Sequence, residues 1–232
     1  MQESVRKVAA VARRGDVLWE WAAAHDADTA GAAARARPAV FLDKDGTLVE
    51  DVPYNVDPAL LRFTPHALEA LRVLADAGLP LVVVSNQPGL ATGRFDPAAL
   101  ARLQRALDAR LQAEAGVALA GFYVCPHAPG EGGAPACACR KPAAGLLRQA
   151  AREHGLDLPR STMVGDILDD VEAAHRAGCA AVLLDVGNET EWRDSPLRRP
   201  EHRARDLLDA AHWILARQRG AEPVGALAAE GP

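Results

Sequence analysis

The chain has 232 residues and a mass of 24.5 kDa, which fits one domain with a modest extension, and a hydrophobic content of 49% suffices for a core. Lys and Arg number 26 against 31 Asp and Glu, and the net charge of -5 argues against a dedicated nucleic-acid or membrane-surface protein. No apolar run approaches the length of a membrane span and the first residues make a poor secretory signal, so we expect a cytoplasmic protein, a monomer, with small-molecule partners and neither nucleic acid nor membrane.

The first 37 residues are rich in Ala and Arg and carry Trp19 and Trp21. They are expected to form one or two short helices around the tryptophans and to end in a Gly/Ala/Arg linker. We therefore expect an N-terminal extension or linker over 1–37, a main domain over 38–219, and a disordered Ala/Gly/Pro tail over 220–232.

The main domain shows an alternation of apolar runs and amphipathic segments. Asp96 is expected to cap a long helix with Pro97 at its first position. Alternating strands and helices predict an α/β fold with a parallel sheet covered on both faces, whose ligands bind beyond the carboxyl ends of the strands. The predicted strands are 39–42, 79–84, 122–125, 162–165 and 181–184, and the other predicted helices are 65–77, 142–154, 169–177 and 203–219.

Two carboxylates, Asp43 and Asp45, lie two residues apart at the end of the first of these strands. Alternation along a strand places them on one side, and Gly46 allows a sharp turn directly after them. Crowded carboxylates attract a hard cation such as Mg²⁺, which would let an anionic phosphate approach an anionic nucleophile. The segment therefore favours phosphoryl transfer, although a DxDG segment on its own is also compatible with a strand followed by an acidic turn.

A second cluster consists of Cys125, His127, Cys137 and Cys139, with nine residues between the histidine and the second cysteine. Three thiols and one imidazole suit a tetrahedral Zn²⁺, and a site with four protein ligands has no position left for substrate. We therefore predict a structural zinc that orders this loop. A reversible disulfide or unligated thiols are the alternatives.

Polar elements also follow the other predicted strands: Ser85-Asn86-Gln87, Arg140-Lys141-Pro142, Gly165-Asp166 and the acidic pair Asp169-Asp170. In this order, together with Asp43 and Asp45, they resemble the four motifs of the haloacid dehalogenase (HAD) phosphatase superfamily over residues 39 to 186. The resemblance implies a HAD-like Rossmannoid sheet, and the short spacing between the motifs leaves no room for a large cap domain.

The resemblance also implies a role for each motif residue. Asp43 would be the nucleophile that forms an aspartyl-phosphate, and Asp45 the acid and base, which requires a raised pKa. Ser85 and Lys141 would hold phosphoryl oxygens. Asp166, the Asp43 carboxylate and the Asp45 backbone carbonyl would bind Mg²⁺.

The Cys/His loop and the Ser85-Asn86-Gln87 segment narrow the resemblance to the branch of the heptose bisphosphate phosphatases, with histidinol-phosphatases as close relatives. Asp51 and Tyr54 would lie in the substrate-side loop, and Arg140 would grip a second phosphate with its planar guanidinium. The resemblance further places Asn86, Gln87, Ser85 and Lys141 among the substrate-binding residues. Two residues depart from the branch: Thr92 stands where Arg is frequent, and Ile167 follows Asp166 where a polar or cationic residue is common.

We therefore predict a Mg²⁺-dependent phosphatase with a structural Zn²⁺, acting on a sugar phosphate, with heptose bisphosphate as the first substrate and histidinol phosphate as the alternative. Two rival classes are a nucleic-acid 3′-phosphatase and a zinc-stabilised binding module without turnover. The acidic net charge and the lack of a basic stripe with interleaved aromatic residues disfavour the first. The complete motif set disfavours the second.

Overall fold

The computed structural model describes residues 9–13, 16–20, 36–130 and 137–220. The predicted linker and tail, Trp21 and the middle of the cysteine loop thus lie largely outside the described residues. The proposed boundary near residue 37 stays a prediction. Arg37, at this boundary, contacts the main domain, because its backbone amide donates to the Gly155 carbonyl at 3.2 Å.

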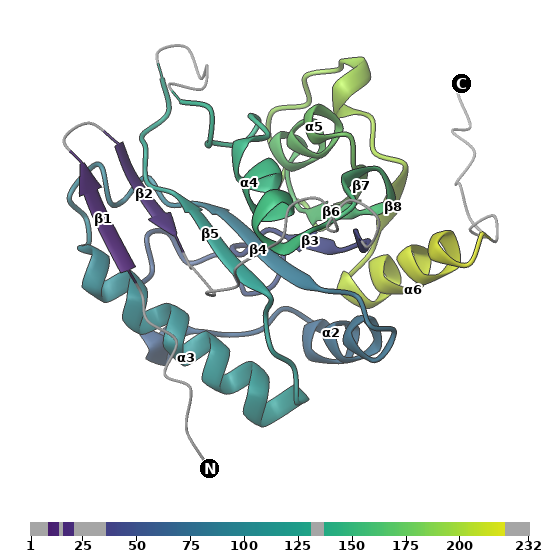
Figure 1. The fold of residues 1–232 in the computed structure, drawn as a ribbon, viewed down its shortest axis with the longest axis horizontal. Helices are drawn as coiled ribbons and strands as arrows, with labels where there is room; N and C mark the ends of the chain where they lie inside the picture. The colour runs from purple at the N-terminus through teal and green to yellow at the C-terminus, as the bar shows by residue number, and fades with distance from the viewer. Residues whose placement is uncertain (1–8, 14–15, 21–35, 131–136, 221–232) are drawn as a thin grey trace.

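A single sheet forms the centre of the fold, in the order β1-β2-β5-β4-β3-β6-β7-β8 (Figure 1). The strands from β3 to β8 pair in parallel, whereas β1 and β2 form an antiparallel hairpin beside β5. This confirms the predicted α/β class and parallel sheet. The strands are β1 (Ala9–Arg13), β2 (Asp16–Glu20), β3 (Val40–Leu42), β4 (Leu81–Asn86), β5 (Gly121–Cys125), β6 (Thr162–Gly165), β7 (Ala180–Leu184) and β8 (His202–Ala204).

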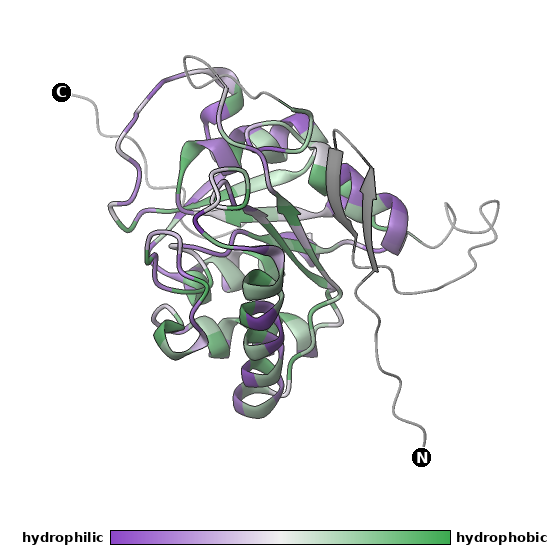
Figure 2. Ribbon diagram, turned by 90° about the vertical axis from the view of Figure 1, so that its left-hand side faces the viewer, coloured by the Kyte–Doolittle hydropathy of each residue, from purple (hydrophilic) through white to green (hydrophobic). Residues whose placement is uncertain are grey.

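The parallel strands from β3 to β7 are buried on both faces, which explains their continuous apolar runs. In β3, Val40 and Leu42 pack on one face and Phe41 on the other. Figure 2 shows the apolar residues along the central strands. The first face is covered by α2 (Ala67–Asp76), α3 (Pro97–Ala115) and α6 (Leu207–Gln218), and the second by α4 (Gly145–His154) and α5 (Leu168–Ala177).

The long helix α3 follows its local sequence signals closely. The Asp96 side chain accepts a hydrogen bond from the Ala99 amide at 2.7 Å, and Pro97 occupies the first turn, where no amide partner is needed. Gly116 ends the helix with a φ of 69°, a left-handed conformation that glycine adopts without strain. The predicted cap and the predicted first residue of this helix are both confirmed.

The expected helices around Trp19 are wrong, because this residue lies in strand β2. Trp19 pairs with Val124 of β5, and β1 and β2 pair with each other over five residue pairs. Pairing with the edge of a sheet overrides the helix propensity of alanine-rich sequence here. The hairpin therefore extends the sheet on the side of the Cys/His loop, since β5 ends at Cys125.

Three predicted helix starts are also wrong. Helix α4 begins at Gly145 and not at Pro142, because the Ala143 amide closes a turn onto the Arg140 carbonyl at 2.7 Å. Helix α6 begins at Leu207 and not at residue 203, since Arg203 pairs with Leu183 in the short strand β8. Helix α2 likewise begins two residues after the predicted start. A local turn sets the start of α4 and strand pairing sets the start of α6, and neither is part of the periodic pattern.

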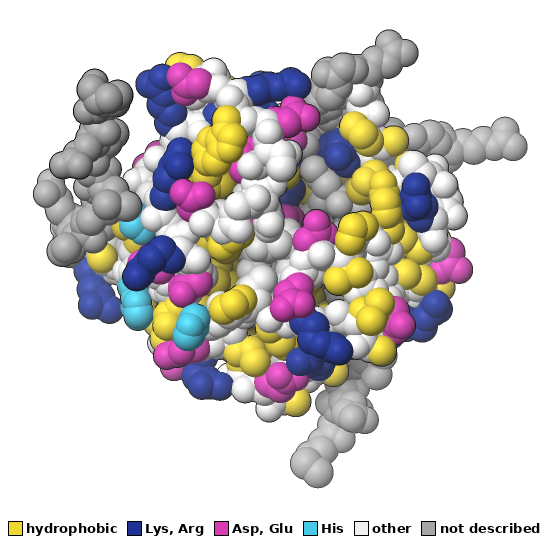
Figure 3. All heavy atoms as spheres, turned by 180° about the vertical axis from the view of Figure 1, so that it is seen from behind, with side chains coloured by type: hydrophobic (Ala, Val, Ile, Leu, Met, Phe, Trp, Pro, Cys, Tyr) yellow, Lys and Arg dark blue, Asp and Glu magenta, His cyan; other side chains and the backbone are white. Residues whose placement is uncertain are grey.

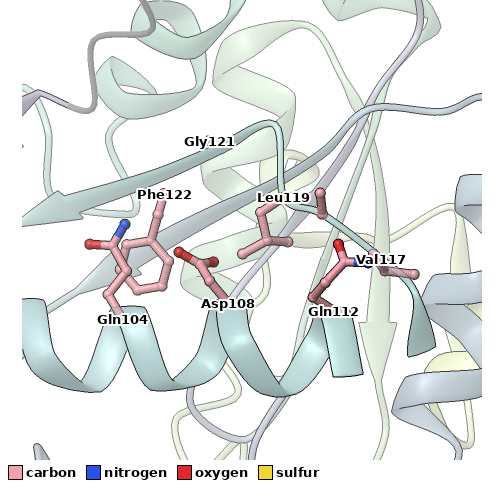
Figure 4. Close-up of a pocket in the computed structure, with 8 residues that line it drawn as sticks. Gln104, Asp108, Gln112, Val117, Leu119, Gly121 and Phe122 are labelled. Atoms are coloured by element: carbon pink, nitrogen blue, oxygen red, sulfur yellow. The ribbon is translucent and has the colours of Figure 1, made fainter. Parts of the chain in front are cut away.

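The surface does not display one dominant charge on the face shown in Figure 3, where acidic and basic side chains are interspersed. Across the described ranges, no helix combines the length and apolarity needed to cross a membrane. One cavity, of about 210 Å³, lies between α3 and the start of β5 (Figure 4). Because Gly121 is the first residue of β5, this cavity lies at the amino end of the strand, away from the polar motifs.

Candidate active site

The turn after β3 carries the first two carboxylates. The Asp43 amide donates to the Val164 carbonyl of the neighbouring strand at 3.0 Å, which fixes the start of the turn. Gly46 has a φ of 79°, and a Cβ there would lie 2.1 Å from an oxygen of Asp166. The glycine is therefore required both for the backbone conformation and for the close approach of the two acidic segments.

Lys141 lies at the centre of the site and is 2% exposed. Its ammonium lies 2.6 Å from Asp43 Oδ1 and 2.6 Å from Asp170 Oδ1, and it donates to the Val84 carbonyl at 3.0 Å. Burial alone would lower the pKa of Lys141, but the charges of Asp170 and Asp43 raise it above its usual range. The lysine is thus charged and bridges two buried carboxylates.

Asp45 and Ser85 are joined by one amide side chain. Gln87 Nε2 donates to Asp45 Oδ2 at 2.8 Å and to Ser85 Oγ at 2.9 Å. Asp45 also forms an ion pair with the buried ammonium of Lys44. Burial raises the pKa of Asp45, with the negative charge of Asp43 adding to the rise and Lys44 opposing it. A raised pKa is the direction that the role of an acid catalyst requires.

The segment Ser85-Asn86 forms the last two residues of β4, so it does not follow the strand as the predicted bounds implied. The Asn86 side chain makes two hydrogen bonds with the backbone of Lys141. Its nitrogen donates to the Lys141 carbonyl and its oxygen accepts from the Lys141 amide, both at 3.1 Å. Asn86 therefore holds the segment that carries the lysine.

Asp166 follows β6 and is 5% exposed. Thr47 Oγ1 donates to its Oδ1 at 3.1 Å, and Asn188 Nδ2 donates to its Oδ2 at 2.9 Å. Burial, and then the charge of Asp43, raise the pKa of Asp166 to about 6. The carboxylate oxygens of Asp43, Asp166 and Asp170 all lie within 4.8 Å of one another, a donor set that suits a hard divalent cation.

The Cys/His loop brings its four predicted ligands together. The sulfur of Cys139 lies 3.2 Å from that of Cys137, 3.3 Å from that of Cys125 and 3.2 Å from His127 Nδ1. Zinc-sulfur bonds of about 2.3 Å in a tetrahedron imply sulfur-sulfur edges of about 3.8 Å, and the sulfurs of Cys125 and Cys137 lie 3.6 Å apart. A disulfide would instead bring two sulfurs to about 2 Å. The four groups could therefore hold one Zn²⁺, and all cysteines of the described residues are free.

Arg140 and Lys141 border a cavity of about 540 Å³ between the Cys/His loop and the loop after β7. Two other arginines in its lining are paired with acids: Arg193 with Glu191 at 2.9 Å, and Arg198 with Asp169 at 2.6 Å. Arg140 instead donates to the neutral His127 carbonyl at 3.3 Å. Among the described residues, its charge therefore has no carboxylate partner within ion-pair distance.

The remaining predicted substrate residues lie elsewhere around the site. Asp51 borders a second cavity, of about 460 Å³, which also contacts Gly46 and Asn188. Tyr54 is 47% exposed, and the Arg94 guanidinium lies over its ring at 4.3 Å. This cation–π contact joins the loop after β3 to the loop after β4.

The sequence analysis gave no role to several groups that the fold brings to this site. Asp170 was noted as one of an acidic pair, but only the structure separates it from Asp169, because the two project to Lys141 and Arg198 respectively. Asn188 and the hydrogen bond of Thr47 were missed. No local signal marks Asn188, since it lies in a loop that approaches Asp166 only in the folded chain.

Comparisons with known proteins agree with this geometry. A family profile described as HAD-hydrolase-like matches residues 138–210. The D-glycero-D-manno-heptose-1,7-bisphosphate 7-phosphatase of Thermosynechococcus vestitus is 38% identical over 187 residues, which span 77% of this chain and 95% of the relative. The D-glycero-beta-D-manno-heptose-1,7-bisphosphate 7-phosphatase of Escherichia coli K12 is 37% identical over 185 residues, covering 78% of this chain and 90% of the relative.

Two solved structures are also similar. The D,D-heptose 1,7-bisphosphate phosphatase of B. bronchiseptica, determined with magnesium and phosphate, has a TM-score of 0.66 at 34% identity, with 78% of this chain and 99% of that chain covered. A HAD-like phosphatase structure from Mesorhizobium loti has a TM-score of 0.67 at 33% identity, with 82% and 90% covered.

Proposed function

Because the chain belongs to the HAD-like phosphatase family that includes the D-glycero-D-manno-heptose-1,7-bisphosphate 7-phosphatases, we propose that it removes the 7-phosphate from this sugar bisphosphate. The observation that carries the proposal is the pairing of Lys141 with Asp43 beside the buried carboxylate of Asp166. In the proposed roles, this arrangement would bring a cation, a nucleophile and a metal-binding group together. It is the constellation that phosphoryl transfer requires.

The donor set fits Mg²⁺, which the relative from B. bronchiseptica contains. Asp43 and Asp166 would hold the ion together with the Asp45 carbonyl, because their oxygens converge and are buried. Asp170 is already paired with Lys141, so we assign it to the lysine. When bound, Mg²⁺ supplies positive charge that offsets the repulsion between carboxylates and phosphate.

The protein groups divide the reaction between them. Asp43 attacks phosphorus and forms an aspartyl-phosphate, while Asp45 protonates the leaving sugar oxygen and then takes a proton from the attacking water. Ser85 and Lys141 bind the non-bridging phosphoryl oxygens as charge redistributes. Gln87 fixes the positions of Asp45 and Ser85 relative to each other, because its side-chain nitrogen donates to both.

The second phosphate of the substrate is assigned to Arg140. Its guanidinium faces a cavity large enough for a sugar, and in the described structure it lacks the acidic partner that Arg193 and Arg198 have. A free guanidinium favours a phosphate over the amine of histidinol phosphate, which remains the alternative substrate. The predicted roles of Asp51 and Tyr54 in substrate binding stay proposals.

Zinc is proposed at Cys125, His127, Cys137 and Cys139 on the tetrahedral spacing of their donor atoms. The loop leads directly into Arg140, whose amide donates to the Cys137 sulfur at 3.3 Å. A filled site would therefore fix the residues that contact phosphate. Its role would be structural, since all four positions are occupied by protein.

The testing experiment is a turnover panel. The α and β anomers of heptose 1,7-bisphosphate and histidinol phosphate would be compared by kcat/KM in the presence of Mg²⁺, with Asp43→Asn as the inactive control. We expect a heptose bisphosphate to be preferred. A higher kcat/KM for histidinol phosphate would contradict the substrate assignment, and release of phosphate by Asp43→Asn at the wild-type rate would contradict the mechanism.

A further inference from the structure

The loop that follows β7 reaches the active site through Asn188. Its side-chain nitrogen donates to Asp166 Oδ2 at 2.9 Å, and the residue borders both the 540 Å³ and the 460 Å³ cavities. Asn188 therefore stands between the two openings that flank the carboxylate cluster. Neither its position in the sequence nor the family motifs assign it a role.

Asp166 is held on three sides. Thr47 donates to one carboxylate oxygen and Asn188 to the other, so the plane of the carboxylate is fixed by two hydrogen bonds. The third side is closed by the backbone at Gly46, where a Cβ would lie 2.1 Å from Asp166 Oδ2 and 2.7 Å from Asn188 Nδ2. Each oxygen keeps a further lone pair for a metal ion.

Glu189 fixes the loop that presents Asn188. One oxygen of its side chain accepts from the Leu168 amide at 2.6 Å, and the other accepts from the Glu191 amide at 2.5 Å. Leu168 opens α5, and the preceding residue, Ile167, has no polar side chain with which to cap the helix. Glu189 supplies this missing cap from a distant part of the chain, in keeping with the preference of helix N-termini for negative charge.

We propose that Asn188 is a positioning residue for Asp166, that Glu189 holds Asn188 in place, and that the pair sets the affinity of the site for its divalent cation. The inference rests on the proposed metal site and goes beyond it, because neither residue is among the proposed ligands. Hydrogen bonds to ligating carboxylates orient the ligands, and their loss weakens metal binding by about 10- to 100-fold.

The first test measures metal binding without substrate. Mn²⁺, which accepts the same oxygen ligands as Mg²⁺, would be titrated into wild type and Asn188→Ala and followed by its paramagnetic resonance signal. We expect at least about a tenfold weaker affinity in the variant. An affinity within twofold of wild type would overturn the proposal. Asp194→Ala is the control, since Asp194 lies in the same connection and pairs only with the exposed Arg199 in the described structure.

Activity supplies a second, independent readout. In Asn188→Ala the Mg²⁺ concentration for half-maximal activity should rise by the same factor as the Mn²⁺ dissociation constant, while kcat at saturating Mg²⁺ stays within about threefold of wild type. A general structural defect would instead lower kcat at every Mg²⁺ concentration. That pattern, with unchanged metal affinity, would count against a positioning role.

A double-mutant cycle tests the part played by Glu189. If Glu189 acts through Asn188, Glu189→Ala should weaken Mn²⁺ binding, and the double variant should bind no more weakly than Asn188→Ala alone. Additive losses would refute the coupling. Because Mn²⁺ binding is measured without substrate, a protein that binds the ion as expected but hydrolyses no heptose bisphosphate would contradict the proposed function and leave this inference standing.

Discussion

Lys141 Nζ lies 2.6 Å from Asp43 Oδ1. The buried lysine is therefore paired with the carboxylate that we assign as the nucleophile. Asp170 approaches the same ammonium at the same distance. Lys141 and two carboxyl groups thus share one buried volume, in which burial raises the pKa of Asp170. Removing the ammonium would leave two carboxyl groups buried without a counter-charge, so the stability of this set depends on Lys141.

Asp43→Asn should abolish turnover while leaving the fold intact. The amide is nearly isosteric with the carboxylate but cannot form the aspartyl-phosphate. We expect kcat to fall by more than about a hundredfold, a loss above roughly 2.7 kcal/mol of transition-state stabilisation. Steady-state kinetics and circular dichroism check this. A variant that keeps more activity than this would exclude covalent catalysis by Asp43.

Lys141→Ala and Arg140→Ala form a contrasting pair of adjacent substitutions. Loss of Lys141 should lower kcat on every substrate, and should also cost about 3 to 5 kcal/mol of stability because it leaves Asp43 and Asp170 buried without a counter-charge.

Loss of Arg140 should spare stability and reduce kcat/KM about ten- to a hundredfold for a bisphosphate only. Kinetics on mono- and bisphosphates, with urea unfolding, measure both effects. Equal losses on the two substrate classes in Arg140→Ala would mean that Arg140 does not bind the second phosphate.

Removal of zinc should act locally. We expect about one zinc per chain by metal analysis, and a chelator that removes it should lower activity through misplaced Arg140 and Lys141 without unfolding the sheet. Cys137→Ser should lose the metal, whereas Cys179→Ala, a buried cysteine outside the cluster, should retain it. Zinc-free protein with full activity, or an ordered disulfide among the cluster cysteines, would refute the assignment.

The raised pKa of Asp166 predicts how stability depends on pH. Its folded-state pKa is about 6, above the ordinary value of 3.8, so the folded protein binds more protons between these values. For the metal-free protein, the contribution of Asp166 to the free energy of unfolding is therefore favourable below about pH 4 and is lost as the pH rises through 6.

Mg²⁺ competes with that proton, so the rise in melting temperature on adding Mg²⁺ should be larger at pH 7 than at pH 5. Thermal unfolding with and without Mg²⁺ at both pH values measures this, with Asp166→Asn as the control that should show little Mg²⁺ response at either pH. A Mg²⁺ response that is larger at pH 5 would contradict the placement of the ion on Asp166.

The sequence could predict those parts of the fold that local patterns determine. Strand β6 and the start of α3 follow from an apolar run and from the Asp96 cap, and both bounds match. Strand β8 and the β1–β2 hairpin were missed because three to five residues carry little periodic signal, and because β2 pairs with β5, which is distant in the chain. Long-range pairing supplies what the local pattern lacks.

The same division holds for the site. The motif residues Asp43, Lys141 and Asp166 could be found because they follow strands whose carboxyl ends meet at one edge of the sheet. Asn188 could not, since its contact with Asp166 depends on the path of a loop without regular structure. Ile167, noted from sequence as a departure, cannot cap α5 with a polar side chain, and Glu189 accepts from the Leu168 amide in its place.

The most direct test of the central claim is the position of the phosphate that is released. Heptose 1,7-bisphosphate would be incubated with the protein and Mg²⁺ and followed by phosphorus NMR, which resolves the two phosphate groups. The account predicts loss of the C7 phosphate signal, growth of inorganic phosphate and an unchanged C1 phosphate signal, none of which should occur with Asp43→Asn. Loss of the C1 phosphate, or no release of phosphate from the bisphosphate, would contradict it.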